Sequence, residues 1–161
     1  MMKHSFTKGT AHWLPSWQMV LNNLDQCMNH GRFRDLGRGG YVALDVIDKD
    51  FGRADDLSSS FGDMVTLHTY ISLSTTSRTS GPHQDMESVY CLQAQGQTHF
   101  KVWENDREYS YLMEAGDLLH IPSGIPHEAI PLTPRVLLSY GDESQLAHNQ
   151  GMEHYHGIET S

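Results

Sequence analysis

Between residues 64 and 140 the chain is made of short stretches with strand character, separated by turn residues. In residues 65–73 apolar side chains alternate with polar ones, which is the period of a β-strand with one buried face. Further strands are predicted at residues 89–93, 98–103, 108–113, 117–121, 127–130 and 136–140. Strands that recur about every ten residues, with Gly, Pro and Asn-Asp turns between them, indicate an antiparallel sandwich or barrel.

A helix is predicted ahead of this region. Pro15-Ser16 is a start signal, and His30-Gly31 is a stop signal whose glycine can take the left-handed conformation that ends a helix. Between them, apolar side chains follow at helical spacing: Trp17, Val20, Leu21, Leu24 and Cys27. Such a stripe normally faces a core, so we expect this helix to pack against the sheet.

Three parts are expected along the chain. Residues 1–63 form an N-terminal helical and loop segment, residues 64–141 form the barrel, and residues 142–161 form a polar tail. The glycine-rich residues 37–40 are interpreted as a turn and not as a phosphate loop, because they precede the strand-like residues 41–47 instead of opening a helix. Residues 48–62 are expected to be a loop or a short helix.

Composition excludes some classes of function. The formal net charge at pH 7 is −9 and the 11 Lys and Arg residues are scattered, which argues against a nucleic-acid partner. No run of about 18 apolar residues predicts a membrane span, and the N-terminus lacks the pattern of a signal peptide. Cys27 and Cys91 are too few for a disulfide framework and are predicted to be buried free thiols. A cytoplasmic location is therefore expected.

Two motifs carry candidate metal ligands. The first is His83-Gln84-Asp85, and residues two apart on a strand point to the same face. The second is a Gly-x5-Pro-x-Gly-x2-His string that ends at His127, and it is the more specific motif because its turn residues and its histidine are fixed together. Two imidazoles and one carboxylate on one side of a metal suit Fe(II) and oxygen chemistry. We predict that His83, Asp85 and His127 bind one divalent metal, Fe(II).

These motifs resemble those of a known superfamily. The segments 83–85, 93–96, 100–103, 116–117 and 121–127 are similar to the cupins and, among these, to the Jumonji-C-like Fe(II)/2-oxoglutarate oxygenases, which include the ribosomal-protein hydroxylases. Asp85 stands where simpler cupins carry a second histidine, which favours the oxygenase branch. The resemblance covers residues 64–141. It implies a mainly β fold, a double-stranded β-helix (cupin or jelly-roll barrel) with an N-terminal helix, and it implies 2-oxoglutarate and O2 as co-substrates beside Fe(II).

Binding of 2-oxoglutarate requires a partner for its distal carboxylate, since a desolvated carboxylate must be paired. The relatives usually carry Lys or Arg two residues after the glycine that matches Gly96, but this chain has Thr98 there. Arg135, at the start of the last strand, is our preferred replacement, although a surface arginine beside the Thr133-Pro134 turn is equally expected. Lys101 lies three residues from Thr98 and should face the opposite side of the strand. Tyr70, Ser80 and Thr98 are candidate hydroxyl donors to the co-substrate, although for each alone an ordinary polar residue of a strand or loop is the more expected role.

The leading hypothesis is an Fe(II)- and 2-oxoglutarate-dependent hydroxylase that forms succinate and CO2. A metal-dependent cupin of another class, an isomerase or a dioxygenase without 2-oxoglutarate, stays open because of Thr98. A non-catalytic metal-binding or sugar-binding barrel is the third alternative. The substrate is a small molecule or a peptide, and a homodimer is compatible with the sequence. The remaining histidines are expected outside the site: His99 and His120 on outward strand positions, and His148, His154 and His156 in the tail.

Overall fold

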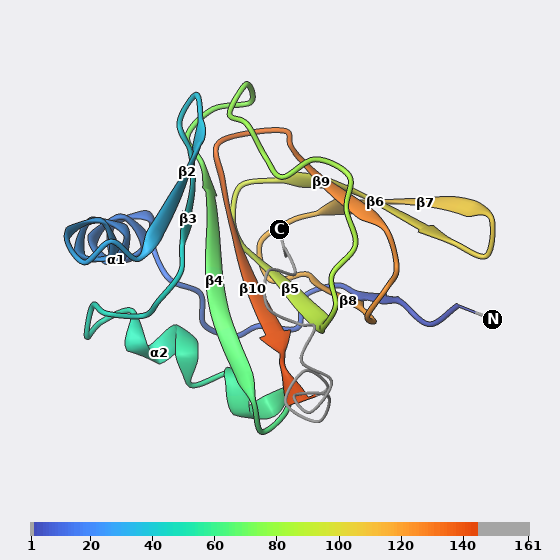
Figure 1. The fold of residues 1–161 in the computed structure, drawn as a ribbon, viewed down its shortest axis with the longest axis horizontal. Helices are drawn as coiled ribbons and strands as arrows, with labels where there is room; N and C mark the ends of the chain where they lie inside the picture. Colours follow the sequence, from blue (N-terminus) through green and yellow to red (C-terminus); the bar gives the residue numbers. More distant parts are fainter. Residues whose placement is uncertain (1, 145–161) are drawn as a thin grey trace, which may run out of the picture.

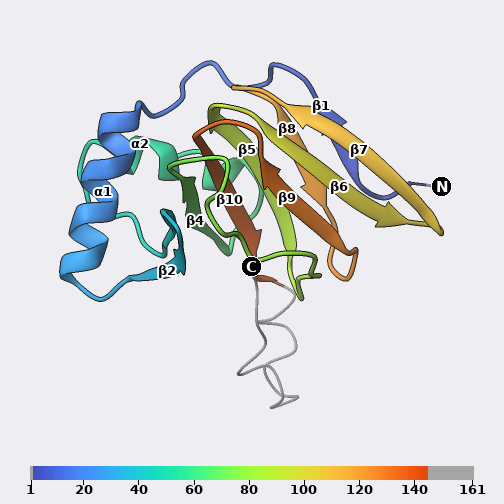
Figure 2. The same cartoon turned by 90° about the horizontal axis from the view of Figure 1, so that it is seen from above.

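The structure, a computed structural model, describes residues 2–144 of the 161-residue chain. Within these residues, strands form two antiparallel sheets that face each other, and two helices lie on the outer side of the larger sheet (Figures 1 and 2). The fold is the mainly β, cupin-type double-stranded β-helix with an N-terminal helix that the sequence predicts. No helix among residues 2–144 is both long and apolar enough to cross a membrane.

The larger sheet has seven strands in the described chain. Their order is β1 (Ser5–Thr7), β8 (Leu118–Ile121), β5 (Ser88–Gln95), β10 (Arg135–Asp142), β4 (Val65–Ser72), β3 (Gly40–Ala43) and β2 (Phe33–Gly37). The smaller sheet consists of β7 (Arg107–Met113), β6 (Thr98–Glu104) and β9 (His127–Pro131). Because β10 lies between β5 and β4, its alternate residues line the middle of the interior between the sheets.

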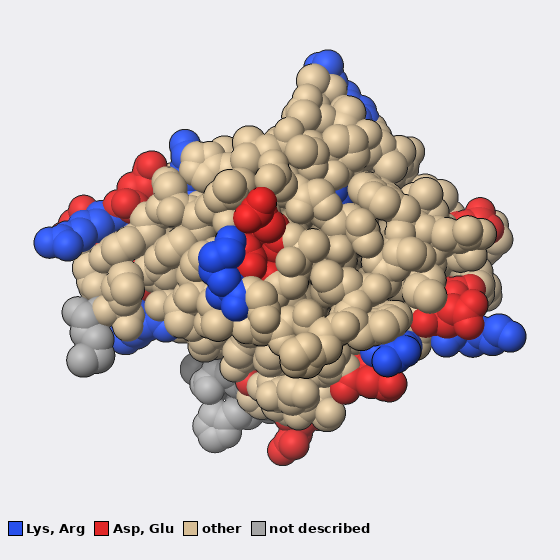
Figure 3. Space-filling model, turned by 180° about the vertical axis from the view of Figure 1, so that it is seen from behind, with Lys and Arg blue, Asp and Glu red and all other residues tan. Residues whose placement is uncertain are grey.

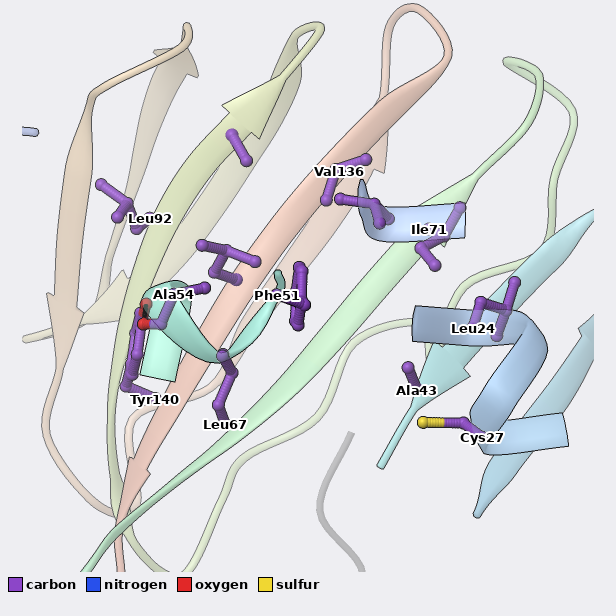
Figure 4. Packing of buried hydrophobic residues seen from close by; sticks show 13 residues of the cluster. Leu24, Cys27, Ala43, Phe51, Ala54, Leu67, Ile71, Leu92, Val136 and Tyr140 are labelled. Atoms are coloured by element: carbon purple, nitrogen blue, oxygen red, sulfur yellow. Dashed lines mark hydrogen bonds between the residues drawn. The ribbon is translucent and has the colours of Figure 1, made fainter. Parts of the chain in front are cut away.

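The helix α1 (Trp17–Asn29) forms where the apolar stripe predicts it. The Ser16 hydroxyl accepts a hydrogen bond from the Met19 amide at 3.2 Å, which caps the first turn. The helix ends at His30, and Gly31 follows with a φ of 68°. Its buried face packs on the outer side of the larger sheet, where Leu24 and Cys27 meet a core that includes Ile71 (Figure 4).

Residues 48–62 contain two short helical elements, α2 (Gly52–Asp55) and the 3-10 turn η1 (Ser58–Ser60). Phe51 is fully buried beside α2, and the Tyr140 hydroxyl donates a hydrogen bond to the Ala54 carbonyl oxygen at 2.7 Å (Figure 4). These contacts cover the outer face of β10, which leaves its other face for the interior between the sheets. The expectation of a loop or short helix here is confirmed.

The N-terminal segment differs from the expectation in its strands. It contributes β1, β2 and β3 to the larger sheet, of which β1 and β2 were not predicted. The strand expected over residues 41–47 stops at Ala43, because the buried Asn23 side chain accepts hydrogen bonds from the amides of Ile47 and Asp48 and draws the chain toward α1. The N-terminal arm also joins the two sheets: β1 pairs with β8, while the His4 ring bonds to Glu104 and Tyr111 of the smaller sheet.

Charged side chains are dispersed over the molecular surface. On the face drawn in Figure 3, the Lys and Arg side chains of the described chain lie apart from one another and form no continuous basic area. This arrangement agrees with the scattered positive charges in the sequence. Cys27 and Cys91 are buried and free, which confirms the expectation for both thiols.

Candidate metal centre and the cavity behind it

His83, Asp85 and His127 meet at one end of the space between the two sheets. His83 and Asp85 lie in the connection between β4 and β5, and His127 is the first residue of β9. The expected strand over residues 83–85 is wrong, since only an isolated bridge joins His83 to His127. The His83 amide donates to the His127 carbonyl oxygen at 3.0 Å, and the His127 amide donates back at 2.8 Å. This reciprocal pair fixes the two motifs relative to each other, and the Gly124 amide, which donates to the Asp85 carbonyl oxygen at 2.9 Å, adds a third link.

The three side chains converge on one point. Their potential ligand atoms all lie within 4.8 Å of one another. His83 Nε2 is 3.6 Å from Asp85 Oδ1, and His127 Nε2 is 3.3 Å from Asp85 Oδ2. These separations leave room for an ion that contacts all three groups, which form a two-imidazole, one-carboxylate donor set.

Hydrogen bonds select the ring nitrogens that face this point. His83 Nδ1 lies 2.7 Å from the Gly81 carbonyl oxygen, and His127 Nδ1 lies 2.9 Å from the Ile125 carbonyl oxygen. A carbonyl oxygen only accepts, so each Nδ1 carries the proton and each Nε2 presents a lone pair. Within the described chain, His83 Nε2 is buried without a hydrogen-bond partner. A buried lone pair of this kind is the arrangement that a metal ion satisfies.

The protonation of the site suits metal binding. Burial lowers the pKa of the His83 imidazole, which keeps the ring neutral at neutral pH as a ligand must be. Asp85 and His127 are only 3% and 4% exposed. The His83 side chain is 21% exposed, so a metal bound here would lie at the edge of the interior, with Asp85 and His127 on its buried side.

A cavity of roughly 400 Å³, mouth included, extends from the three side chains into the space between the sheets. Its polar lining includes Tyr70, Cys91, Arg135 and Ser139, and the loop between β4 and β5 adds Thr79, Ser80 and Gly81. Apolar side chains complete the walls: Val89, Phe100, Ala129 and Leu137.

Arg135 lies buried in this cavity and is not a surface residue. It is 2% exposed, and its Nε donates a hydrogen bond to the Ser72 hydroxyl at 3.0 Å. Nη1 is buried and has no hydrogen-bond partner in residues 2–144. Burial lowers the pKa of Arg135 to about 10, so the guanidinium is still charged at neutral pH. An unpaired buried cation of this kind is a site for an anionic group.

The other residues expected to contact a co-substrate fall into two groups. Tyr70 and Ser80 line the cavity together with the metal centre. Thr98 is fully buried on the inner face of β6 and its hydroxyl has no partner among the described residues, but it does not line the cavity. Lys101 lies opposite Glu128 on β9, on the outward phase of β6, and does not reach the interior. Thr98 and Lys101 are thus not brought together with the metal centre.

Three interior residues were not predicted from the sequence as residues of the site. Ser72 orients Arg135, while Cys91 and Ser139 line the cavity on neighbouring strands. Burial raises the pKa of the Cys91 thiol to about 12, so this group stays protonated. Because alternate residues of a strand point to the same face, the sequence of β5 and β10 could have predicted that Cys91 and Ser139 face the interior. The position of Ser72 depends on the pairing of β4 with β10, which the local sequence does not encode.

The histidines expected outside the site are absent from the lining of the cavity. His120 lies on β8 and stacks on Tyr90, with ring centroids 4.2 Å apart and an interplanar angle of 10°. His99 lies on the outward phase of β6, between Leu112 and Ile130 of the neighbouring strands. His148, His154 and His156 lie outside the described residues.

Comparison with known proteins finds likeness in structure only. No family model matches the chain, and no curated protein matches it. Among solved structures, the ribosomal oxygenase YcfD of Escherichia coli, in complex with cobalt and 2-oxoglutarate, superposes with a TM-score of 0.57 and 20% identity over 76% of this chain and 38% of that one. Salicylate 1,2-dioxygenase of Pseudoaminobacter salicylatoxidans, with bound gentisate, superposes with a TM-score of 0.53 and 13% identity over 86% of this chain and 34% of that one.

The present chain therefore spans less than half of the length of either of these proteins. At such identities the likeness establishes the fold. The cupin-type double-stranded β-helix is common to all three structures, whereas the chemistry of this chain has to be argued from its own residues.

Proposed function

We propose that this protein is an Fe(II)- and 2-oxoglutarate-dependent oxygenase that hydroxylates a substrate with O2. The observation that carries the proposal is that a two-histidine, one-carboxylate site shares one cavity with a buried guanidinium whose Nη1 has no hydrogen-bond partner among residues 2–144. The first group suits a divalent metal, and the second suits the far carboxylate of a dicarboxylic acid. A 2-oxo dicarboxylate is a ligand that uses both.

The metal side of the proposal rests on His83, Asp85 and His127. Their donor set fits Fe(II), and their placement on one side leaves coordination positions open toward the cavity. Fe(II), when bound, supplies the activation of O2, which no protein side chain performs. The protein orients the two imidazoles through the Gly81 and Ile125 carbonyl oxygens and holds water away by burial.

The co-substrate side rests on Arg135. Its free Nη1 would donate to the distal carboxylate of 2-oxoglutarate, while the Ser72 hydroxyl holds Nε in place. In this role Arg135 replaces the cation that the relatives carry at the position of Thr98. Ser80 and Tyr70 add hydroxyl groups to the same cavity. The apolar walls at Val89, Phe100 and Leu137 exclude water from the bound acid.

The overall reaction balances without another reductant. One oxygen atom of O2 becomes the hydroxyl group of the product and the other enters succinate, while the first carboxylate carbon of 2-oxoglutarate leaves as CO2. Succinate is therefore the product that identifies this reaction class, whatever the substrate is.

A second candidate, a dioxygenase that uses no 2-oxoglutarate, is favoured by one observation. Among the described residues that line the cavity, Arg135 is the one Lys or Arg side chain, and Thr98 supplies no second cation. Arg135 could then hold the carboxylate of the substrate itself, and the salicylate dioxygenase with the same fold gives a precedent for an acidic ring ligand. This candidate predicts oxygen uptake with an aromatic or aliphatic acid and no succinate.

The first test is an anaerobic titration of the metal-free chain with Fe(II) and then with 2-oxoglutarate. The 2-oxoglutarate proposal expects a weak visible charge-transfer band that appears only when both are present. The alternatives, an isomerase, a dioxygenase without 2-oxoglutarate and a non-catalytic metal or sugar barrel, all expect no such band. The cytoplasmic location, the homodimer and the choice between a small-molecule and a peptide substrate stay predictions.

A further inference from the structure

The Cys91 thiol lies inside the candidate site, and the proposed function gives it no role. Its side chain lines the cavity from β5, and the residue is only 3% exposed. Among the described residues that line this cavity, Cys91 is the one that carries sulfur. Sulfur accepts oxygen atoms stepwise, from sulfenic to sulfonic acid. The position of this thiol therefore matters for oxygen chemistry in the cavity.

Cys91 lies close to both ends of the cavity. It pairs with Ser139 of β10, four residues after Arg135, and Ser139 lines the same cavity. Burial raises the pKa of the Cys91 thiol to about 12, and smaller effects come from two charged groups: the Asp85 carboxylate raises this pKa, and the Arg135 guanidinium lowers it. A ligand that reaches from the metal centre to Arg135 would thus pass beside the thiol.

Two polar atoms mark this cavity as a ligand site. Arg135, which is 2% exposed, has no hydrogen-bond partner for Nη1 within residues 2–144, and His83 Nε2 also lacks one there. Both residues line the cavity together with Cys91. A buried thiol alone would be an ordinary small apolar residue. Cys91 is distinguished by its place in the wall of a cavity that is built for a ligand.

Cys27 is the ordinary case in the same chain. It is fully buried in the core between α1 and the larger sheet, and its Sγ donates a hydrogen bond to the Asp45 carbonyl oxygen at 3.3 Å. It does not line the cavity. The two thiols therefore match in burial and differ in their access to the metal centre, which makes Cys27 an internal control.

The environment of Cys91 disfavours oxidants that come from solution. Thiols that react with dissolved peroxide are exposed and ionised, whereas Cys91 is buried and protonated. An oxygen atom that is activated within the cavity needs neither exposure nor ionisation of the thiol. Oxidation of Cys91 should therefore depend on chemistry at the metal centre.

We propose that Cys91 is a modification site, at which the thiol becomes a sulfenic acid when 2-oxoglutarate and O2 react in the cavity without a bound substrate. The inference rests on the proposed function. One oxygen atom of O2 enters between the sulfur and its hydrogen, the other enters succinate, and CO2 leaves. O2 takes up four electrons, two from 2-oxoglutarate and two from the thiol, so no further reductant is needed.

The modification limits the consumption of 2-oxoglutarate when no substrate is present. The added oxygen atom takes up space beside the path from the metal centre to Arg135, so 2-oxoglutarate should bind roughly tenfold more weakly to the oxidised chain. Dithiothreitol reduces a sulfenic acid to the thiol, with water and the cyclic disulfide as products, and should restore binding. Calorimetry of the chain reloaded with Zn(II), which supports no turnover, measures both effects.

The test incubates the full chain in air with Fe(II), 2-oxoglutarate and catalase, without a substrate. The chain is then unfolded in urea with dimedone, which tags sulfenic acids, and its peptides are weighed. We expect a tag on Cys91 only when Fe(II), 2-oxoglutarate and O2 are all present, and no tag on Cys27. Under ¹⁸O₂ the intact chain should gain one labelled oxygen atom before the tag is added. Hydrogen peroxide added to the metal-free chain should leave Cys91 untagged.

The matched variants are Cys91→Ser and Cys27→Ser. Cys91→Ser should gain no oxygen atom and should form succinate for several-fold longer than the wild type before the reaction stops. Cys27→Ser should stop as early as the wild type. A tag on Cys91 without 2-oxoglutarate, an equal tag on Cys27, or an oxygen atom on Tyr70 with Cys91 intact would overturn the assignment. Thermal unfolding verifies that both variants fold.

Failure of this inference is distinguishable from failure of the proposed function. If the anaerobic chain with Fe(II) and 2-oxoglutarate shows the charge-transfer band, but Cys91 stays unmodified in air, only the assignment of Cys91 is wrong. If the band is absent and no succinate forms, the proposed function fails, and the inference fails with it.

Discussion

The Arg135 guanidinium donates from Nε to the Ser72 hydroxyl at 3.0 Å, and both side chains are at least 98% buried, at adjacent positions of β10 and β4. Among residues 2–144, Nη1 has no hydrogen-bond partner, and Arg135 lines the cavity. A charged group held so firmly and left incompletely paired is costly for the fold alone. An anionic ligand would supply the missing partner, which is the reason that the proposed function assigns the co-substrate to Arg135.

Replacement of Arg135 should separate co-substrate binding from metal binding. We expect Arg135→Met to weaken 2-oxoglutarate binding about a hundredfold, because Arg135 is the one Lys or Arg side chain among the described residues that line the cavity. Fe(II) affinity should be unchanged, since Arg135 contributes no ligand atom. Isothermal titration with each ligand measures both. Lys101→Met is the matched control, because Lys101 lies outside the cavity, and an equal loss in that variant would remove Arg135 from the account.

Ser72 should act as a positioning residue. Ser72→Ala removes the acceptor of Arg135 Nε but retains the guanidinium, so KM for 2-oxoglutarate should rise several-fold while kcat changes little. Steady-state kinetics of succinate formation give both constants. Ser72→Cys, which keeps a weak acceptor, should recover part of the loss. A fall in kcat with unchanged KM would instead indicate a role at the metal.

Asp85 should be required for metal retention and dispensable for the fold. Asp85→Ala removes the one carboxylate of the donor set and should abolish retention of Fe(II) after desalting. The free energy of unfolding of the metal-free chain should not fall, because a buried charge is removed. Metal analysis and urea unfolding measure the two effects. Iron retained at one equivalent in Asp85→Ala would place the metal elsewhere.

Gly96 links the turn after β5 to the position of Arg135. Its φ is +69°, and a Cβ atom there would lie 2.0 Å from the Pro134 carbonyl oxygen and 2.9 Å from Arg135 Cα. Gly96→Ala should lower the free energy of unfolding by about 3 kcal/mol and weaken 2-oxoglutarate binding as β10 shifts. Gly31, with a φ of +68° and nothing within 4 Å, is the matched control. Gly31→Ala should cost about 1 kcal/mol and leave 2-oxoglutarate binding unchanged.

The stability of the metal-free chain should fall in mildly acidic solution. The pKa values of His68 and His120 are lowered by burial, so below the unfolded pKa of about 6.5 the unfolded chain binds protons that the folded chain does not. The contribution of these two neutral imidazoles to the free energy of unfolding is thus fully present above that pH, and it is lost as the pH falls below it. Urea unfolding at pH values from about 5 to about 8 measures how steeply the free energy of unfolding changes with pH. His68→Asn should make it shallower, and an unchanged slope would show that His68 does not contribute.

Much of the fold could be predicted because β4 to β10 alternate apolar and polar residues and are separated by Gly and Pro turns. The strands β1 and β2 lack this alternation, and β1 pairs with β8 more than a hundred residues later in the chain. No local pattern encodes such a pairing. The stretch 83–85 was expected as a strand, but the chain forms only one bridge there, and it is this bridge to His127 that completes the candidate site.

The position of Arg135 could not be decided from the sequence. After the Thr133-Pro134 turn, the pairing of β10 decides which of its side chains point inward. The pairing of β10 with β5 shifts register between Val136 and Leu137. Such an irregularity changes which side chains point inward, and the sequence does not reveal it. Thr98 departs from the pattern of the relatives, and in the structure the buried Arg135 side chain lines the cavity from another strand, β10.

The measurement that tests the proposed function most directly is the formation of succinate in air by the full chain with Fe(II) and 2-oxoglutarate, followed by NMR. We expect that succinate forms only when the chain, Fe(II) and 2-oxoglutarate are all present. Asp85→Ala should form none, and Arg135→Met should have a strongly raised KM for 2-oxoglutarate. Absence of succinate from a chain shown to hold one equivalent of Fe(II) would contradict the account, and oxygen uptake with another acid in its place would favour the dioxygenase that uses no 2-oxoglutarate.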